Sequence, residues 1–480
     1  MNQTKNNPKR NLPETFFVTG IWFLLTLYIA LPQGLKTRIG VINIANNSSP
    51  ELIRKAWGPG DAGSLLDTAI TWSKFHQIDR TTQFWIVHLW TPGMSIIEIP
   101  LIWLSKLGLP IFWTLLFITL IVWSTVFWFT WRFISPIIGR LPCVFVAAIL
   151  VASWDFRYIF REDLFYTEGL SFGFLMLGIG FITWEYLLGS SRLYPYVIGG
   201  VLIGTSIMIR YVSDIGVLIL FVVATTLLFL QLRGSIFSRA LSNKSKSKTN
   251  RKNPKAKDRV TTFFEFLWFA KSLRIFGVWI SCAIAFLFTL PWRIASHFIF
   301  DGPFFTLSGA SGLVGPLLWL PTSKLGFWKF SGMNWSCVID PIKCAALNQS
   351  GKTIGSSSSL LKAGVFTAIR HPLAFLSTRW HFLELQWIRR DGISGMGYVL
   401  ENIFSVIPIL LLGVGVILVI RNPLSARASW IWLPLLMAEI GQLLIVHYES
   451  RYFIPVRLFA LGFFIFTLFG ERTRRLNDRT

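Results

Sequence analysis

An aspartate at the start of a short helical segment is the residue in this sequence best placed to act as a general base. A Gly-Pro-Gly turn over 58–60 precedes Asp61, and the helical pattern AGSLLDTAITWSKF follows it. A carboxylate at a helix start can serve simply as an N-cap. Held at the mouth of an apolar cavity, where desolvation makes a carboxylate a stronger base, it can instead accept a proton from a substrate. Asp67 in the same segment is the weaker candidate.

A second group of candidates lies in the stretch WDFRYIFREDLFYTE over 154–168, which mixes both charges with aromatic residues. Such a boundary is ordinarily a membrane-interface belt with charged side chains reaching toward water. Its density of charge is high, however, and Glu168 falls inside the apolar run that follows. Ionisable residues inside such runs are functional candidates. We therefore interpret Asp155, Asp163 and Glu168 as substrate-binding residues.

Charged residues also flank two later turns. Arg210 and Asp214 bracket the turn IRYVSD, and the simplest expectation is that they pair with each other. The segment HYESRYFIPVR contains Glu449, Arg451 and Tyr452, and the planar guanidinium of Arg451 suits a phosphate.

Glu439 lies inside an apolar run. It has two interpretations that the sequence leaves open: a proton-relay residue, or a buried partner for Arg210.

The elements that must position these residues are long apolar helices. The chain has 480 residues, of which 53% are hydrophobic and 14% charged, compared with about 25% charged in soluble domains. The net charge of +23 does not indicate a nucleic-acid-binding protein, because the basic residues lie between apolar runs rather than in one patch. Several runs reach the roughly 17 to 25 residues that cross a bilayer. The sequence therefore predicts an all-α polytopic membrane protein.

The distribution of Lys and Arg predicts the orientation. The segment 233–259 carries the strongest basic cluster and is expected in the cytoplasm. The apolar segment 84–108 contains Pro92, Gly93, Glu98 and Pro100, which interrupt a helix. We interpret it as an interfacial or re-entrant element, which gives ten spans with both termini cytoplasmic. An eleventh span results if 84–108 crosses the membrane.

This topology divides the chain into three parts. They are an N-terminal transmembrane module over 1–291 with a first outer loop at 33–110, a second outer loop over 292–401, and C-terminal transmembrane helices over 402–480. Cys337 and Cys344 lie in the second outer loop, where a disulfide and two free thiols are equally consistent with the sequence. No CxxC or HExxH spacing appears, so no metal site is expected.

Several motifs together resemble the GT-C superfamily of membrane glycosyltransferases, notably the aminoarabinose transferases and protein O-mannosyltransferases. They are Asp61-x-x-x-Leu65-x-x-x-Ala69, Thr91-Pro92-Gly93, Thr167-Glu168-Gly169-Leu170, Gly200-x-x-x-Gly204 before Arg210, and Arg451-Tyr452-Phe453-Ile454-Pro455. The chain departs from the family where the usual Asp-Glu pair is Asp61-Ala62 and the usual Tyr is Leu65.

The resemblance implies a sugar donor linked to polyprenyl phosphate, an active site outside the cytoplasm and a catalytic Asp61. Inverting transfer would then need one base plus cations such as Arg210 or Arg451, and no cofactor. The acceptor is an unidentified glycan, lipid or protein, and the expected location is the bacterial plasma membrane. Three alternatives stay open: a transporter or flippase for an amphipathic substrate, a polysaccharide polymerase or ligase, and an inactive scaffold of this family.

Overall fold

The computed structural model describes an all-helical chain over residues 12–47, 61–76, 91–109, 111–153, 159–160, 167–188, 192–210, 214–248, 254–299, 396–421, 429–445 and 453–477, with a few residues between 369 and 376. No strand occurs within these ranges. The helices of the first half are α1 (Leu12–Asn47), α3 (Asp61–Ser73), α5 (Gly93–Ser105), α6 (Ile111–Phe129), the π-helical turn η1 (Thr130–Ile134), α7 (Ser135–Ile138), α8 (Arg140–Ala152) and α10 (Glu168–Leu188). Those of the second half are α11 (Tyr194–Ile209), α12 (Asp214–Lys248), α13 (Pro254–Ile294), η3 (Ala295–Ile299), α19 (Met396–Arg421), α20 (Ser429–Ile445) and α21 (Ile454–Asn477).

Five helical stretches are long and apolar enough to cross a membrane. They are Leu12–Ala30, Trp113–Ile138, Glu168–Leu188, Asp214–Gln231 and Leu273–Ile299. In the first of them only 17% of the most apolar window is buried in the protein. Apolar side chains such as Phe16, Phe17 and Leu24 are left exposed on its surface. Water would not tolerate an apolar surface of this extent, whereas lipid would, so these helices indicate an integral membrane protein.

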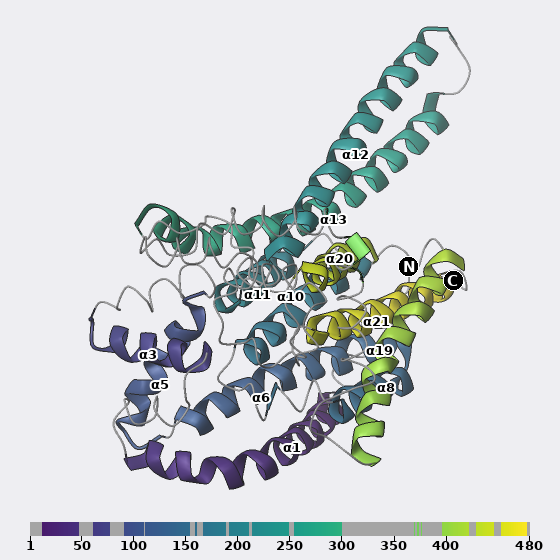
Figure 1. Ribbon diagram of the computed structural model, residues 1–480. Coiled ribbons are helices and arrows are strands. Elements are labelled where there is room, and N and C mark those ends of the chain that lie inside the picture. Colours follow the sequence, from purple (N-terminus) through teal and green to yellow (C-terminus); the bar gives the residue numbers. More distant parts are fainter. Residues whose placement is uncertain are drawn as a thin grey trace.

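Helices α10, α11, α12 and α13 run alternately up and down, so that sequence-distant helix ends meet. The α10–α11, α11–α13 and α12–α13 pairs pack along their lengths, and α20 packs on both α12 and α21. The distal part of α12 and the first part of α13 project from the bundle as a hairpin (Figure 1). The described parts of the basic segment, 233–248 in α12 and 254–259 in α13, lie in this hairpin, at the opposite ends of the two helices from Asp214 and Arg293.

Two elements differ in length from a standard membrane span. Helix α1 continues past Ala30, where its candidate membrane span ends, as far as Asn47. Helix α5 has only 13 residues, or about 20 Å at 1.5 Å per residue, which is too short for the roughly 30 Å hydrocarbon core. Because α8, which is one of the ten predicted spans, also has 13 residues, length alone does not set α5 apart, and the interfacial or re-entrant element stays a prediction. Residues 84–90 lie outside the described part.

Glycines allow α10 and α11 to pack with their backbones close together. A Cβ atom at Gly178 would lie 2.8 Å from the Gly199 carbonyl oxygen, and one at Gly199 would lie 2.9 Å from the Gly178 carbonyl oxygen. These distances are too short for a real Cβ atom, and the obstructing atoms belong to the backbone. Small residues at such a contact let two membrane helices gain van der Waals packing that larger side chains would prevent.

We expect Gly178→Ala to lower the thermal unfolding midpoint of the purified protein. The added methyl group must push α10 and α11 apart, and overpacking of this kind typically costs about 1–3 kcal/mol. Gly413→Ala in α19 is the matched control, because nothing lies within 4 Å of a Cβ atom there. Equal midpoints for the two variants would show that the α10–α11 contact is not as close as described.

Candidate functional site

The candidate site lies where α10 and α12 begin and where α11 and α13 end. Glu168 and Asp214 stand in the first turns of α10 and α12. Arg210 caps the C-terminus of α11, and Arg293 stands in the last turn of α13. Negative charge is favoured at a helix start and positive charge at a helix end. The helix dipoles therefore favour all four charges at this one end of the bundle.

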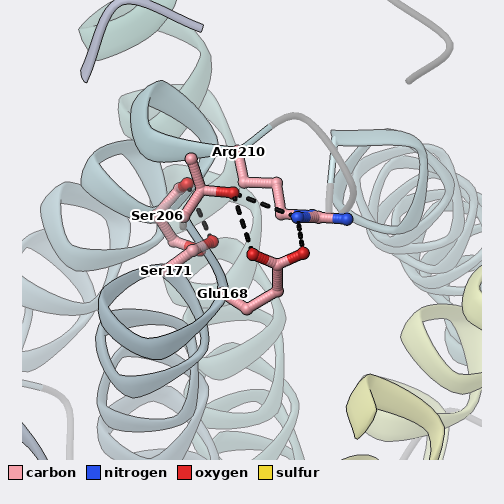
Figure 2. A network of polar contacts seen from close by, with 5 residues as sticks. Glu168, Ser171, Ser206 and Arg210 are labelled. Carbon is pink, nitrogen blue, oxygen red and sulfur yellow. Dashed lines mark hydrogen bonds and ion pairs between the residues drawn. The ribbon is translucent and has the colours of Figure 1, made fainter. Parts of the chain in front are cut away.

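An ion pair between Arg210 and Glu168 forms the centre of the site. Nη1 of Arg210 donates hydrogen bonds to Oε1 of Glu168 and, at 3.0 Å, to Oγ1 of Thr167 (Figure 2). The Glu168 side chain is fully buried, whereas 15% of the Arg210 side chain is exposed. This arrangement shows that Glu168 is a buried ionisable residue in the first turn of an apolar helix, and that the Arg210 side chain is mostly but not wholly buried.

Two serines join α10 and α11 one turn below the ion pair. Oγ of Ser171 lies 2.9 Å from Oγ of Ser206 and donates to the Ser206 carbonyl oxygen at 3.1 Å (Figure 2). That carbonyl oxygen also accepts a hydrogen bond from the Arg210 backbone N–H at 2.8 Å. The serines therefore fix the backbone from which the Arg210 side chain extends.

The predicted pairing between Arg210 and Asp214 is wrong. Oδ1 of Asp214 accepts a hydrogen bond from Nη2 of Arg293 at 2.5 Å, across the α12–α13 contact. Arg293 is fully buried, and its Nε donates to Oγ1 of Thr289 at 2.9 Å. Helix packing brings Glu168 and Asp214 each beside an arginine that is distant in sequence. These pairs replace the expected pair of Arg210 and Asp214, which are only four residues apart.

Glu439 of α20 is a third buried carboxylate near this end. Its side chain is nearly inaccessible, and its charge interacts with that of Arg210. Glu439 is therefore close enough to Arg210 for their charges to interact, and both of its interpretations, a proton-relay residue and a buried partner of Arg210, stay open. The guanidinium lies in the field of two carboxylates, Glu168 in direct contact and Glu439 from α20.

Helix α5 connects α11, which ends at Arg210, to α3, the helix that begins at Asp61. Oγ of Ser95 in α5 donates to the Leu65 carbonyl oxygen of α3 at 2.8 Å. A Cβ atom at Gly93 would lie 2.3 Å from the Met208 carbonyl oxygen, so α5 touches α11 two residues before Arg210. The helix that starts at Asp61 is thus attached, through α5, to the helix that ends at Arg210.

Glu98 lies within α5 and is fully buried. Neither of its carboxyl oxygens has a hydrogen-bond partner among the described residues. Burial raises the pKa of the Glu98 carboxyl well above its usual range, because an apolar environment penalises the charged form. Burial therefore favours the uncharged form of Glu98, which has no described cation beside it of the kind that Arg210 provides for Glu168.

The structure places some of the predicted site residues and not others. Glu168 and Arg210 are brought together, and α3 begins at Asp61 as predicted. Asp155, Asp163, Glu449, Arg451 and Tyr452 lie outside the described residues, as do Cys337 and Cys344. The sequence interpretation missed Arg293 and the Ser171–Ser206 pair, and it named Thr167 only as part of a motif. The position of Arg293, a charge inside the last turn of an apolar helix, was the available signal.

Metal-ligating side chains do not cluster in the part of the chain that the structure describes. Comparison with known proteins gives no family: no family model, no curated protein and no solved structure matches this chain. The site must therefore be interpreted from its own geometry.

We expect Arg293→Gln to destabilise the protein severely. The substitution leaves Asp214 buried without its cation, and removing one partner of a buried pair typically costs about 3–5 kcal/mol. Arg140→Gln is the control, because Arg140 pairs with Glu14 at 2.6 Å while 65% of the Arg140 side chain is exposed. Exposed pairs contribute roughly 0–1 kcal/mol. Similar unfolding midpoints for the two variants would contradict the buried Asp214–Arg293 pair.

Proposed function

We propose that the protein is a membrane glycosyltransferase that moves a sugar from a polyprenyl-phosphate donor to an acceptor outside the cytoplasm. The observation that carries the proposal is the partly exposed Arg210, held by the buried Glu168 and attached through α5 to the helix that begins at Asp61. A cation and a candidate base are thus positioned by helices that touch one another. The resemblance to the GT-C superfamily supports the same assignment.

The electrostatics of Arg210 suit a lipid phosphate. A guanidinium offers five N–H donors in a planar fork that matches phosphate oxygens. Glu168 orients this fork, and the exposed 15% of the side chain provides access for a ligand. Close to a membrane the local dielectric constant is low, so a fixed cation stabilises developing negative charge more strongly than it would in water.

In the proposed reaction the phosphate is the leaving group. Asp61 takes the proton of the acceptor nucleophile, whose electron pair attacks the anomeric carbon. The bond between that carbon and the phosphate oxygen breaks with inversion, and its electron pair stays on the phosphate. Arg210, together with Arg451, neutralises the phosphate, so no strong general acid is needed. Asp155, Asp163, Glu449 and Tyr452 would contact the sugar and acceptor.

The proposed topology puts this chemistry on the outer face. The basic segment 233–259, whose described parts lie in the α12–α13 hairpin, is assigned to the cytoplasm. Asp214 and Arg293, at the opposite ends of α12 and α13, then lie on the outer side with Arg210. Both termini are cytoplasmic, ten helices cross, α5 lies at the outer interface, and the membrane is the bacterial plasma membrane.

A transporter of an amphipathic substrate is the second candidate. Glu439, buried inside α20 and electrostatically coupled to Arg210, favours it, since ionisable residues inside membrane helices often mark transport or proton pathways. The experiment that follows separates the two candidates.

We expect purified protein to transfer labelled sugar from polyprenyl-phosphate sugars to an acceptor, and Asp61→Asn to reduce the rate at least about 100-fold, because the amide cannot accept the proton. Asp67→Asn, two turns along the same helix, is the matched control and should keep most of the activity.

Undiminished transfer by Asp61→Asn would remove this residue from the mechanism. Substrate flux in vesicles without any transfer by the wild type would favour the transporter.

We also expect a reporter fused at residue 245 to lie in the cytoplasm, because this position is within the basic segment 233–259. Alkaline phosphatase, which is active only outside the cytoplasm, should be inactive there, and green fluorescent protein should be fluorescent. The reverse pattern would overturn the orientation and with it the outer location of the Arg210 site.

A further inference from the structure

A second group of ionisable side chains lies at the end of the bundle from which the α12–α13 hairpin projects. Glu185 stands in the last turn of α10, Tyr196 in the first turn of α11, and Arg274 at the start of the apolar stretch of α13. We call these three residues the Glu185 cluster. At 1.5 Å per residue, Glu185 is about 25 Å along α10 from Glu168, so the cluster is separate from the site described above.

Close packing of α11 on α13 fixes Tyr196 beside Arg274. An added Cβ atom at Gly277 would lie 2.5 Å from Cε2 of the Tyr196 ring, so the ring lies against the α13 backbone there. Oγ of Ser281 also donates to the Tyr196 carbonyl oxygen at 2.8 Å. Gly277 follows Arg274 by three residues and therefore shares its helix face. The phenol of Tyr196 is thus held on the face of α13 that carries Arg274.

Glu185 approaches the same phenol from α10. An added Cβ atom at Gly199 would lie 2.6 Å from Cγ1 of Ile182, which places these two residues opposite each other. Because α10 and α11 run in opposite directions, Glu185 and Tyr196 stand opposite each other one turn further along. The carboxyl group of Glu185 and the guanidinium of Arg274 both act electrostatically on the Tyr196 phenol, with opposite sign.

The Glu185 cluster is incomplete as a hydrogen-bonding group. Oε1 of Glu185, the phenolic oxygen of Tyr196 and Nε of Arg274 are buried and make no hydrogen bond to any described residue. Glu185 and Tyr196 are almost inaccessible, whereas Arg274 is only partly buried. Buried polar groups nearly always have partners, because leaving one unpaired costs free energy. A ligand that brings both donors and acceptors would satisfy all three side chains.

The position of the cluster indicates a lipid as the source of this ligand. The apolar stretch of α10 ends at Leu188 and that of α13 begins at Leu273, so the cluster lies where the hydrocarbon core gives way to headgroups. Large apolar side chains around it, among them Leu188, Tyr194 and Phe276, are exposed. They suit contact with acyl chains. A headgroup is therefore the polar group that reaches Arg274 from the membrane.

The pairing of an acid with a cation selects the kind of headgroup. A primary ammonium has N–H groups to donate to Glu185, and a phosphate can accept from Tyr196 and Arg274. An anionic headgroup without an ammonium would bring its charge towards Glu185 and leave that carboxyl group unpaired. A trimethylated ammonium has no N–H to donate. The cluster is therefore complementary to a headgroup that carries both a phosphate and a primary ammonium.

We propose that the Glu185 cluster binds the headgroup of a zwitterionic phospholipid with a primary ammonium, such as phosphatidylethanolamine. The ammonium lies at Glu185, and the phosphate lies between Tyr196 and Arg274. On the proposed topology this lipid comes from the inner leaflet. The chemistry of binding depends neither on that orientation nor on sugar transfer, so the inference stands apart from the proposed function.

The test compares three phospholipids with the same acyl chains, which carry ethanolamine, choline or glycerol headgroups. Their binding to the full-length protein in detergent is measured by native mass spectrometry. We expect the wild type to bind the ethanolamine lipid about tenfold more tightly than the other two, the effect of a hydrogen bond to a charged group. Glu185→Gln should abolish this preference, and Arg274→Gln should weaken binding of the ethanolamine lipid about tenfold.

The matched controls are Glu14→Gln and Arg140→Gln, which remove the same charges from an ion pair between α1 and α8. Both should keep the preference of the wild type. Glycerophosphoethanolamine, which has the headgroup without acyl chains, should not compete at equal concentration. If the Glu185 and Arg274 variants do not fold, the wild type still decides: a photoreactive ethanolamine lipid should label the segments around Leu188 and Phe276.

Equal affinity of the wild type for the three lipids would overturn the inference and leave the unpaired atoms of the cluster to water. An unchanged preference in Glu185→Gln, or labelling confined to other segments, would also overturn it. Equal competition by glycerophosphoethanolamine would replace the lipid by a soluble ligand with the same chemistry.

Discussion

A charge that is removed from water must be accompanied by an opposite charge, and this constraint shapes the whole bundle. The ion pairs Glu168–Arg210 and Asp214–Arg293 lie inside helices that are otherwise apolar. An isolated ion in such an environment costs several kcal/mol even after the protein has relaxed around it. Each carboxylate therefore requires a helix that carries an arginine at the same depth, and this requirement sets which helices can be neighbours.

The same constraint explains why the charges gather at one end. Acids in the first turns of α10 and α12 and arginines at the ends of α11 and α13 all match the helix dipoles. Alternating helix direction then brings the four charges to one side. The charged side chains of the candidate site therefore gather where the apolar helices end, next to α3 and α5. The hairpin formed by α12 and α13 projects from the opposite end.

Three carboxylates face two arginines among these buried groups. Glu439 of α20 is the third buried carboxyl group, and it lies close enough to Arg210 to interact with it. Three helices, α10, α11 and α20, thus bring ionisable side chains to the Arg210 site.

The sequence predicted the helical class, the helix that begins at Asp61 and the position of Glu168 within an apolar run, because these depend on local patterns. Apolar runs of helical length identify membrane helices, and a carboxylate within such a run stands out. The partners of Arg210 and Asp214 could not be predicted in this way. They come from α10 and α13, 42 and 79 residues distant in sequence, and only helix packing brings them close.

Arg293 illustrates the same limit. In the sequence it follows an apolar run and resembles an arginine that reaches to the membrane surface. In the structure it is fully buried, with Asp214 and Thr289 as its partners.

The most direct test of the account is an experimental structure of the protein with a non-reactive polyprenyl-phosphate sugar analogue. The account predicts the phosphate within hydrogen-bond distance of the Arg210 guanidinium, with Glu168 still paired to it and the sugar facing Asp61. A phosphate bound at the end of the bundle that carries the 233–259 hairpin, or one remote from Arg210, would contradict it.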